Sequence, residues 1–213
     1  DYGVGEKKIS IPPTLLYSVF GDQPDVRFTA TSDFKNAGEK IYLVGESKEE
    51  LGASEISFML HESGEAAGIG GQVPLLPEPE RNLTTYRALS TAIQAGLIRT
   101  AHDCSEGGVA VAAAEMCIGG RVGAEIDIDG TGPSSNWSRL WGESLGRFIV
   151  GVQPEDEADF VEWMSGHPIT LLGTVNDTDK LVIVDGYEVL VEAKTDSMVE
   201  AWQNTLDMTG GVA

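Results

Sequence analysis

The chain has 213 residues, of which 34 are acidic and 14 are basic, and its formal net charge is −20. This excess of negative charge argues against general binding to nucleic acid or to an anionic membrane, because both need a positive protein surface. Hydrophobic residues make up 41% of the chain, enough for a substantial core. No apolar run reaches the roughly 18 residues that would predict a membrane-spanning helix. The length fits one large domain, or one domain with an additional segment.

Two further features concern the cell compartment and the extent of the chain. Cys104 and Cys117 show neither CxxC spacing nor a disulfide framework, so we expect reduced, buried thiols in a cytoplasmic protein. The chain begins Asp1-Tyr2-Gly3, without a methionine or a signal-peptide pattern. We therefore expect a piece of a longer polypeptide, or a processed form.

The first half of the chain predicts short elements around a long interval without periodicity. We expect residues 1–11 to be loose and the Ile11-Pro12-Pro13-Thr14 run to be extended, because proline disfavours helical geometry in the residue before it. Ser54 is a plausible N-cap for a helix over residues 55–61. The glycine- and proline-rich residues 63–77 predict a mobile loop or an interface segment. The expected strands are 15–20, 26–31 and 41–44, and a helix is expected over 79–95 with Gly96 at its end.

The second half alternates short strands with helices. Glu125, Asp127 and Asp129 fall on one side of a strand over 122–128, which favours a solvated face and leaves a cation site as the alternative. Asp185-Gly186 predicts a hairpin turn, and Asp196 a cap for the last helix. The order predicts an α+β domain, a small mixed or antiparallel sheet with helices packed on it. The remaining expected elements are helices over 137–141, 155–165 and 196–208 and strands over 148–152, 169–175, 181–184 and 188–191.

Residues 98–118 form the stretch with the most distinctive chemistry: a short strand, a polar turn and an apolar helix. Gly107 and Gly108 fall where the helix should begin, although glycine weakens a helix. They make sense if an anion such as phosphate approaches the unpaired N–H groups of the helix end, with Ser105 as a cap. A buried corner that needs two glycines for tight packing explains them equally well. Both interpretations stay open on local grounds.

Four stretches resemble known families. His102-Asp103-Cys104-Ser105-Glu106-Gly107-Gly108 resembles the His-Asp-x-Ser-Asp/Glu-Gly-Gly motif of the aminoimidazole ribonucleotide synthetase-related superfamily, C-terminal domain. Residues 11–14, Leu51-Gly52-Ala53-Ser54-Glu55 and Leu140-Trp141-Gly142-Glu143-Ser144-Leu145-Gly146-Arg147 resemble the large subunit of phosphoribosylformylglycinamidine (FGAM) synthase. Aminoimidazole ribonucleotide synthetase and selenophosphate synthetase are alternative relatives.

This resemblance implies a C-terminal domain of an FGAM synthase, an ATP-dependent ligase that amidates formylglycinamide ribonucleotide in purine synthesis. Residues 1–35 would be a lead-in and connecting strands from a missing N-terminal half, and residues 36–213 the domain itself. ATP and Mg²⁺ would be bound mainly by the missing half. The implied partners are a glutaminase subunit, a small bridging subunit and a homologous domain in the same chain or a dimer, with no nucleic acid and no membrane. A non-catalytic module for auxiliary nucleotide binding or assembly is the alternative.

The resemblance also assigns candidate site residues. Ala53, Leu145 and Trp141 depart from the glycine, glutamine and phenylalanine usual in the family, and Leu145 removes the polar contact of the glutamine from this copy of the site. Ser105 is expected to be a cap rather than a nucleophile and Arg147 to be structural, whereas Glu143 fits either a structural or a ligand-binding role. No metal ligand is assigned. The catalytic candidate is His102, and the substrate- or phosphate-binding candidates are Gly52, Ser54, Glu55, Asp103, Ser105, Glu106, Gly107, Gly108, Glu143 and Ser144.

Overall fold

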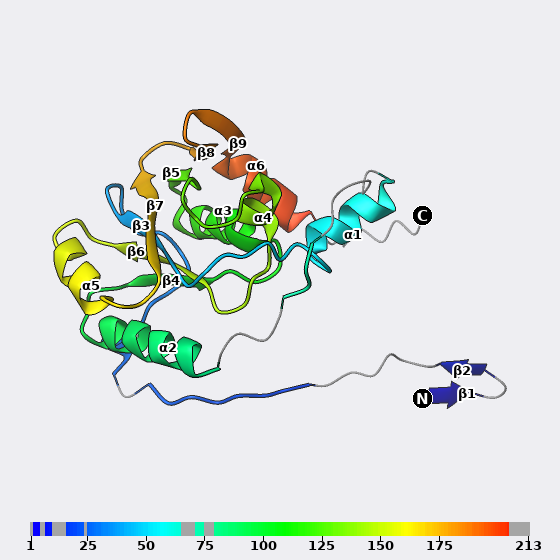
Figure 1. The fold of residues 1–213 in the computed structure, drawn as a ribbon, viewed down its shortest axis with the longest axis horizontal. Coiled ribbons are helices and arrows are strands. Elements are labelled where there is room, and N and C mark those ends of the chain that lie inside the picture. The colour runs from blue at the N-terminus through cyan, green and yellow to red at the C-terminus, as the bar shows by residue number, and fades with distance from the viewer. Residues whose placement is uncertain are drawn as a thin grey trace.

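The computed structural model describes residues 2–4, 7–9, 16–23, 25–64, 71–74 and 79–204. Its centre is a seven-stranded sheet in the order β4-β6-β3-β7-β5-β8-β9 (Figure 1). All neighbouring strands are antiparallel except β5 and β8, which are parallel. The predicted α+β class with a mixed sheet is confirmed. The strands are β3 (Lys40–Val44), β4 (Thr100–Asp103), β5 (Gly123–Asp127), β6 (Phe148–Val152), β7 (Ile169–Asn176), β8 (Lys180–Asp185) and β9 (Glu188–Lys194).

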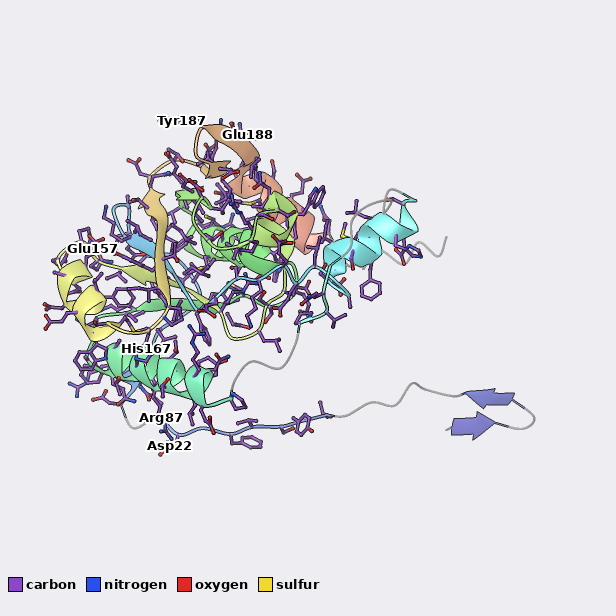
Figure 2. The ribbon with its side chains drawn as sticks, in the orientation of Figure 1. Asp22, Arg87, Glu157, His167, Tyr187 and Glu188 are labelled. Atoms are coloured by element: carbon purple, nitrogen blue, oxygen red, sulfur yellow. The ribbon has the colours of Figure 1, made fainter. Side chains whose placement is uncertain are left out.

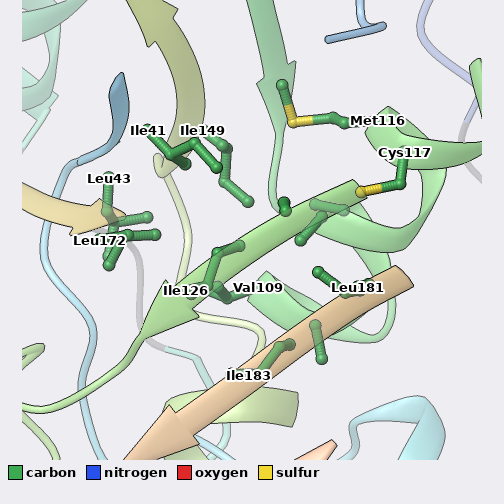
Figure 3. Close-up of a cluster of buried hydrophobic side chains, with 14 of the residues drawn as sticks. Ile41, Leu43, Val109, Met116, Cys117, Ile126, Ile149, Leu172, Leu181 and Ile183 are labelled. Carbon is green, nitrogen blue, oxygen red and sulfur yellow. The ribbon is translucent and has the colours of Figure 1, made fainter. Parts of the chain in front are cut away.

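Helices cover both faces of the sheet, and strand β3 shows how the sequence divides the core between them. Ile41 and Leu43 belong to the cluster on the side of α3 (Gly108–Gly120), α4 (Asn136–Trp141) and α6 (Thr195–Gln203), which Figure 3 shows in part. Tyr42 and Val44 join the opposite cluster, with α2 (Pro79–Gln94) and α5 (Glu157–Trp163). Because successive strand side chains point to opposite faces, the apolar run of β3 fills both layers.

Helix α1 (Glu55–Glu62) differs from the other described α-helices, since none of its residues is buried. It stands apart from the sheet, beyond α4 and α6 (Figure 1). Ser54 is the N-cap, as predicted: its Oγ accepts a hydrogen bond from the backbone N–H of Ser57. Most helices and strands expected from residue 40 onwards are confirmed, with bounds that shift by a few residues.

The N-terminal region corrects three expectations. The strand predicted over 15–20 is wrong for its described residues, 16–20, which have no regular structure. Val26–Phe28 form a 3₁₀ helix rather than a strand, and only Thr31 bridges to the sheet, beside Thr100. Residues expected to be loose instead form two antiparallel strands, β1 (Tyr2–Val4) and β2 (Lys7–Ile9). The expected extended run 11–14 lies outside the described residues.

The C-terminal hairpin agrees with the sequence, whereas the cap of the last helix does not. Gly186 has a φ of +59° in the turn between β8 and β9, beside the exposed Tyr187 and Glu188 (Figure 2). Asp196 lies in the first turn of α6 and does not cap it, because the helix begins one residue earlier, at Thr195. Residues 205–208 of the expected helix are outside the described part. None of the helices in the described ranges is long and apolar enough to cross a membrane.

Candidate functional site

A cavity of about 620 Å³ lies where three of the resembling stretches meet. Ala53 comes from the corner before α1, residues 103–106 from the turn after β4, and residues 143 and 145–148 from the segment that enters β6. These three segments are far apart in the sequence, and the fold brings them together. The described residues that line the cavity are Ala53, Val73, Pro74, Tyr86, Asp103, Cys104, Ser105, Glu106, Glu143, Leu145, Gly146, Arg147 and Phe148.

The turn after β4 gives the cavity its acidic wall. The Ser105 hydroxyl donates a hydrogen bond to Asp103 Oδ2, and this bond lowers the pKa of the Asp103 carboxyl below its usual value. Ser105 therefore does not cap α3, which corrects the prediction: Gly107 holds the N-cap position, without a side-chain cap. Asp103 and Glu106 are exposed at the cavity, so both present oxygen acceptors to a ligand.

His102 lies on the other side of β4. Its Nε2 is 2.8 Å from Glu115 Oε2 of α3, and its Nδ1 is 3.4 Å from Asp103 Oδ1. It is absent from the residues that line the cavity. The structure thus places the imidazole against helix α3 and brings Asp103, but not His102, to the cavity.

The glycine pair has a packing explanation. Gly108 has a φ of +64°, and a Cβ added there would lie 2.5 Å from the carbonyl oxygen of Gly142 and 2.8 Å from that of Leu140. Gly107 is also buried, with a φ of +77°. Both positions need glycine for backbone conformation, and Gly108 needs it for close approach to the end of α4 as well. Neither glycine lines the cavity.

Glu143 occupies the position that an anion would take on the first of the two interpretations of the glycine pair. Its Oε1 accepts hydrogen bonds from the backbone N–H of Gly107 and from that of Glu55, each at 2.9 Å. These two N–H groups belong to the beginnings of α3 and α1. A carboxylate is favourable there because the N-terminal end of a helix carries partial positive charge and unpaired donors.

Arg147 has the structural role that the sequence predicts. Its guanidinium is buried and donates to the carbonyl oxygens of Ser144 and Gly142 and to the Ser47 hydroxyl. Burial lowers the pKa of Arg147 below its usual value, although the nearby negative groups oppose this effect. The residue holds the segment 142–147 in a closed turn.

The remaining candidates lie behind or beside the cavity wall. Ser54 is fully buried and also donates to the carbonyl oxygen of Leu51, while Gly52 N–H donates to the carbonyl oxygen of Gln72. The Ser144 hydroxyl is buried and accepts from the N–H of Lys48. Glu55 meets Glu143 through its backbone N–H. These four support the wall rather than line it.

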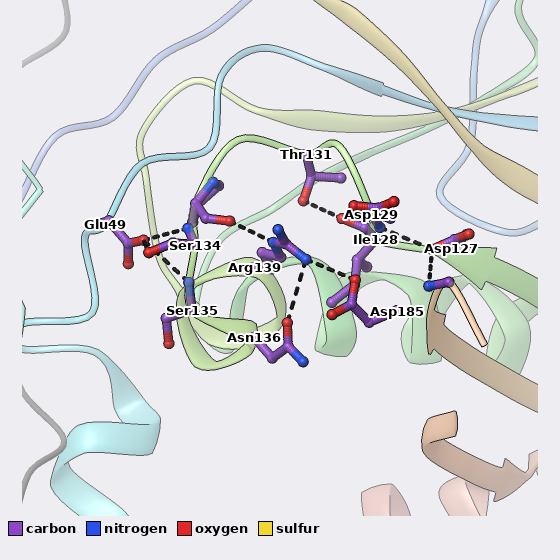
Figure 4. A network of polar contacts seen from close by, with 12 residues as sticks. Glu49, Asp127, Ile128, Asp129, Thr131, Ser134, Ser135, Asn136, Arg139 and Asp185 are labelled. Carbon is purple, nitrogen blue, oxygen red and sulfur yellow. Dashed lines mark hydrogen bonds and ion pairs between the residues drawn. The ribbon is translucent and has the colours of Figure 1, made fainter. Parts of the chain in front are cut away.

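Two further residues, Tyr86 and Glu49, are not among the candidates predicted from the sequence. Tyr86 of α2 is partly exposed and lines the cavity. Glu49 caps α4 from a distance: its Oε1 accepts from the backbone N–H groups of Ser134 and Ser135 and from the Ser134 hydroxyl (Figure 4). Hydrogen bonds from Ser138 first, and then Ser134, lower the pKa of Glu49 to about 2. No local sequence pattern identifies this cap, because Glu49 lies 85 residues before Ser134 in the chain.

Whether ATP and Mg²⁺ fit the cavity depends on the charged residues that line it. Among the described residues that line it, Arg147 is the one cation, and its donors already bind two carbonyl groups and a hydroxyl. In the described ranges no three His, Cys, Asp or Glu side chains come together in a way that could hold a metal ion. The described residues that line this cavity therefore do not fit a magnesium triphosphate.

Comparison with solved structures shows where this fold recurs. Phosphoribosylformylglycinamidine synthase II from Thermotoga maritima matches with a TM-score of 0.64 and 18% identity over 81% of this chain and 28% of that chain. T. maritima PurL complexed with FGAR matches with a TM-score of 0.65 and 17% identity, over 81% and 30% of the two chains. Hydrogenase maturation protein HypE in complex with ATP matches with a TM-score of 0.52 and 13% identity, over 78% and 53%. These identities show a shared fold, and the chain spans less than a third of the two T. maritima proteins.

A family model provides the assignment. The family described as AIR synthase related protein, C-terminal domain, matches residues 36–186, well over half of the chain. The match includes β3 to β8, the 103–108 turn and the segment 142–147 that contains Glu143 and Arg147. The chain belongs to the AIR synthase related protein, C-terminal domain family.

Proposed function

We propose that this chain is the C-terminal domain of an FGAM synthase and forms one wall of the site in which formylglycinamide ribonucleotide is amidated. The cavity of about 620 Å³ carries the proposal, because it brings the superfamily motif of residues 102–108 together with two of the three stretches that resemble that enzyme. The family membership and the fold shared with T. maritima FGAM synthase II support it. On this proposal residues 36–213 are the domain, residues 1–35 lead into it, and the enzyme works in the cytoplasm.

The cavity favours a particular part of such a substrate. Asp103 has a lowered pKa and is ionised at neutral pH, and Glu106 stands beside it, so both accept hydrogen bonds from hydroxyl or N–H groups. Tyr86 and Phe148 add aromatic surface. We propose that this wall binds and orients the nitrogen- or hydroxyl-bearing part of the ribonucleotide. ATP and Mg²⁺ would be held outside the described residues, and a glutaminase with a small bridging subunit would supply ammonia.

The test is formation of FGAM from formylglycinamide ribonucleotide, ATP and ammonia by the protein in the form that its gene encodes. Asp103→Ala should lower kcat/KM at least about tenfold, the effect of losing a hydrogen bond to a charged group. Asp177→Ala is the matched control, because Asp177 is exposed and lies outside the cavity. Absence of turnover in the parent protein would reject the reaction, whereas an unchanged Asp103→Ala would reject this cavity as its site.

A second candidate function is an auxiliary nucleotide-binding or assembly module without chemistry of its own. Leu145 favours it, because this residue lines the cavity with an apolar side chain where the family usually has glutamine. Calorimetric titration with ATP, followed by a hydrolysis assay, separates the two: binding of nucleotide without turnover supports the module, and FGAM formation that depends on Asp103 rejects it.

A further inference from the structure

We propose that Glu143 is a positioning residue that takes the place of an anion at two helix N-termini, and so fixes α1 against the turn 103–108. We call the two hydrogen bonds that Glu143 accepts from Glu55 and Gly107 the joint. The joint is a property of the free chain, and only its consequence for ligands rests on the proposed function. One carboxylate oxygen serves two segments that enter the fold 88 and 36 residues away from it.

The geometry shows why this carboxylate matters more than an ordinary cap. Both N–H groups lie 2.9 Å from the same Oε1, which is the distance of a good charge-assisted hydrogen bond. Helix α3 has no side-chain cap, and Glu143 accepts a hydrogen bond from the backbone N–H of its N-cap residue, Gly107. The segment that carries Glu143 is itself held by Arg147 through the carbonyl groups of Gly142 and Ser144.

The two helices depend on this joint to different degrees. α3 buries seven of its residues in the core and would keep its place without Glu143. α1 buries none, and the corner before it is held by Leu51, Ser54 and the bond from Gly52 N–H to the carbonyl of Gln72. Glu143 is therefore the described link that joins the first turn of α1 directly to the acidic wall of the cavity.

The joint also has a consequence for specificity. With Glu143 in place, the N–H groups of Gly107 and Glu55 already donate to a carboxylate, so a phosphate that approached them would meet a negative group. Asp103 and Glu106 add to the same repulsion from the facing turn. This corner of the cavity should therefore reject phosphate and admit the neutral, hydrogen-bond-donating part of a ligand.

Residue-resolved hydrogen exchange by NMR tests the joint in the free chain. In Glu143→Ala the amides of Glu55 and Gly107 should both exchange roughly tenfold faster or more, as expected for loss of a charged acceptor. Glu143→Gln retains one side-chain oxygen, so its exchange rates at these two amides should lie between those of the parent chain and of Glu143→Ala. This second variant keeps the test valid if the alanine variant folds poorly. Glu49→Ala is the matched control, because it removes a distant carboxylate cap from α4 and should affect the amides of Ser134 and Ser135 instead. Unchanged exchange at either Glu55 or Gly107 would overturn the proposal.

Titration with small anions tests separately whether Glu143 substitutes for an anion and whether it keeps anions out of the parent chain. Acetate added to Glu143→Ala should restore slow exchange at both amides, and inorganic phosphate should shift their signals in that variant but not in the parent chain. Phosphate-induced shifts of the same amides in the parent would overturn the claim that Glu143 excludes anions, and failure of acetate and phosphate to act on Glu143→Ala would overturn its role as an anion substitute. Because no substrate is present, these outcomes do not depend on whether the protein makes FGAM.

Discussion

The corner that leads into α1 has a side-chain cap of its own, whereas the corner that leads into α3 has none. In the first, the buried Ser54 closes the corner locally and the helix beyond it buries nothing. In the second, two glycines allow the backbone to press against the end of α4, and the helix beyond is core. The same Glu143 oxygen serves both. The weakly packed helix α1 is thus held by hydrogen bonds, and the well-packed helix α3 by side-chain and backbone contacts. Three substitutions at these corners should therefore change the free energy of unfolding by different amounts, one of them with opposite sign.

The largest effect is expected for Gly108→Ala. The new methyl group would clash with the carbonyl oxygens of Gly142 and Leu140 and sit at a positive φ, so we expect the free energy of unfolding to fall by about 3 kcal/mol or more. Gly130→Ala is the control: Gly130 has a φ of +77° but nothing within 4 Å of a Cβ, so the loss should be about 1 kcal/mol. Urea unfolding curves measure both. Equal losses in the two variants would mean that contact with α4 does not set the need for glycine.

A smaller loss is expected for Ser54→Ala at the other corner. The variant loses the acceptor for Ser57 N–H and the donor to the Leu51 carbonyl oxygen, so stability should fall by about 1–2 kcal/mol. Amide exchange should rise mainly within α1, because that helix has no buried residue to hold it. Ser63→Ala, at the exposed C-terminal end of the same helix, should change stability by less than about 0.5 kcal/mol. Equal effects of the two serine variants would contradict the capping role.

The smallest effect, opposite in sign, is expected for Ala53→Gly. Ala53 has a φ of +59°, a conformation that costs an alanine about 1 kcal/mol, so glycine should stabilise the fold by about 0.5 kcal/mol after its greater entropy in the unfolded chain is subtracted. The same change at Ala158, an exposed residue within α5, should destabilise the fold by about 1 kcal/mol. Thermal unfolding of both variants gives the comparison. Destabilisation by Ala53→Gly would show that the corner does not strain alanine.

Two serines show how far local sequence reasoning reaches. Ser54 and Ser105 both precede a helix and both are predicted to cap it. The prediction holds for Ser54, since the helix begins at the next residue. It fails for Ser105, because Gly107 and Gly108 adopt positive φ values and delay the helix, which leaves the hydroxyl to Asp103. Spacing of residue types was visible in the sequence, but the backbone angles that decide between the two outcomes were not.

The core was easier to predict than the site. Continuous apolar runs identified β3 and β6, because strands covered on both faces need no polar positions. Glu143 was open between a structural and a ligand-binding role, since its two partners lie far away in the chain and no local pattern connects them. The catalytic role of His102 is predicted through the resemblance alone. The sequence does not show that its ring lies against Glu115, because that contact depends on how β4 packs against α3.

The short bridge at Thr31 has a consequence for where the folded unit begins. Thr31 N–H donates to the carbonyl of Arg99, and Ala101 N–H donates to the carbonyl of Thr31, so this residue covers the outer edge of β4. An uncovered strand edge is a template for pairing with another chain. The opposite edge, β9, carries the charged side chains Glu188, Glu192 and Lys194 instead. A chain shortened to residues 36–213 would therefore lose the buried Phe34 and expose one strand edge. It should self-associate at concentrations at which a chain beginning at residue 16 stays monomeric.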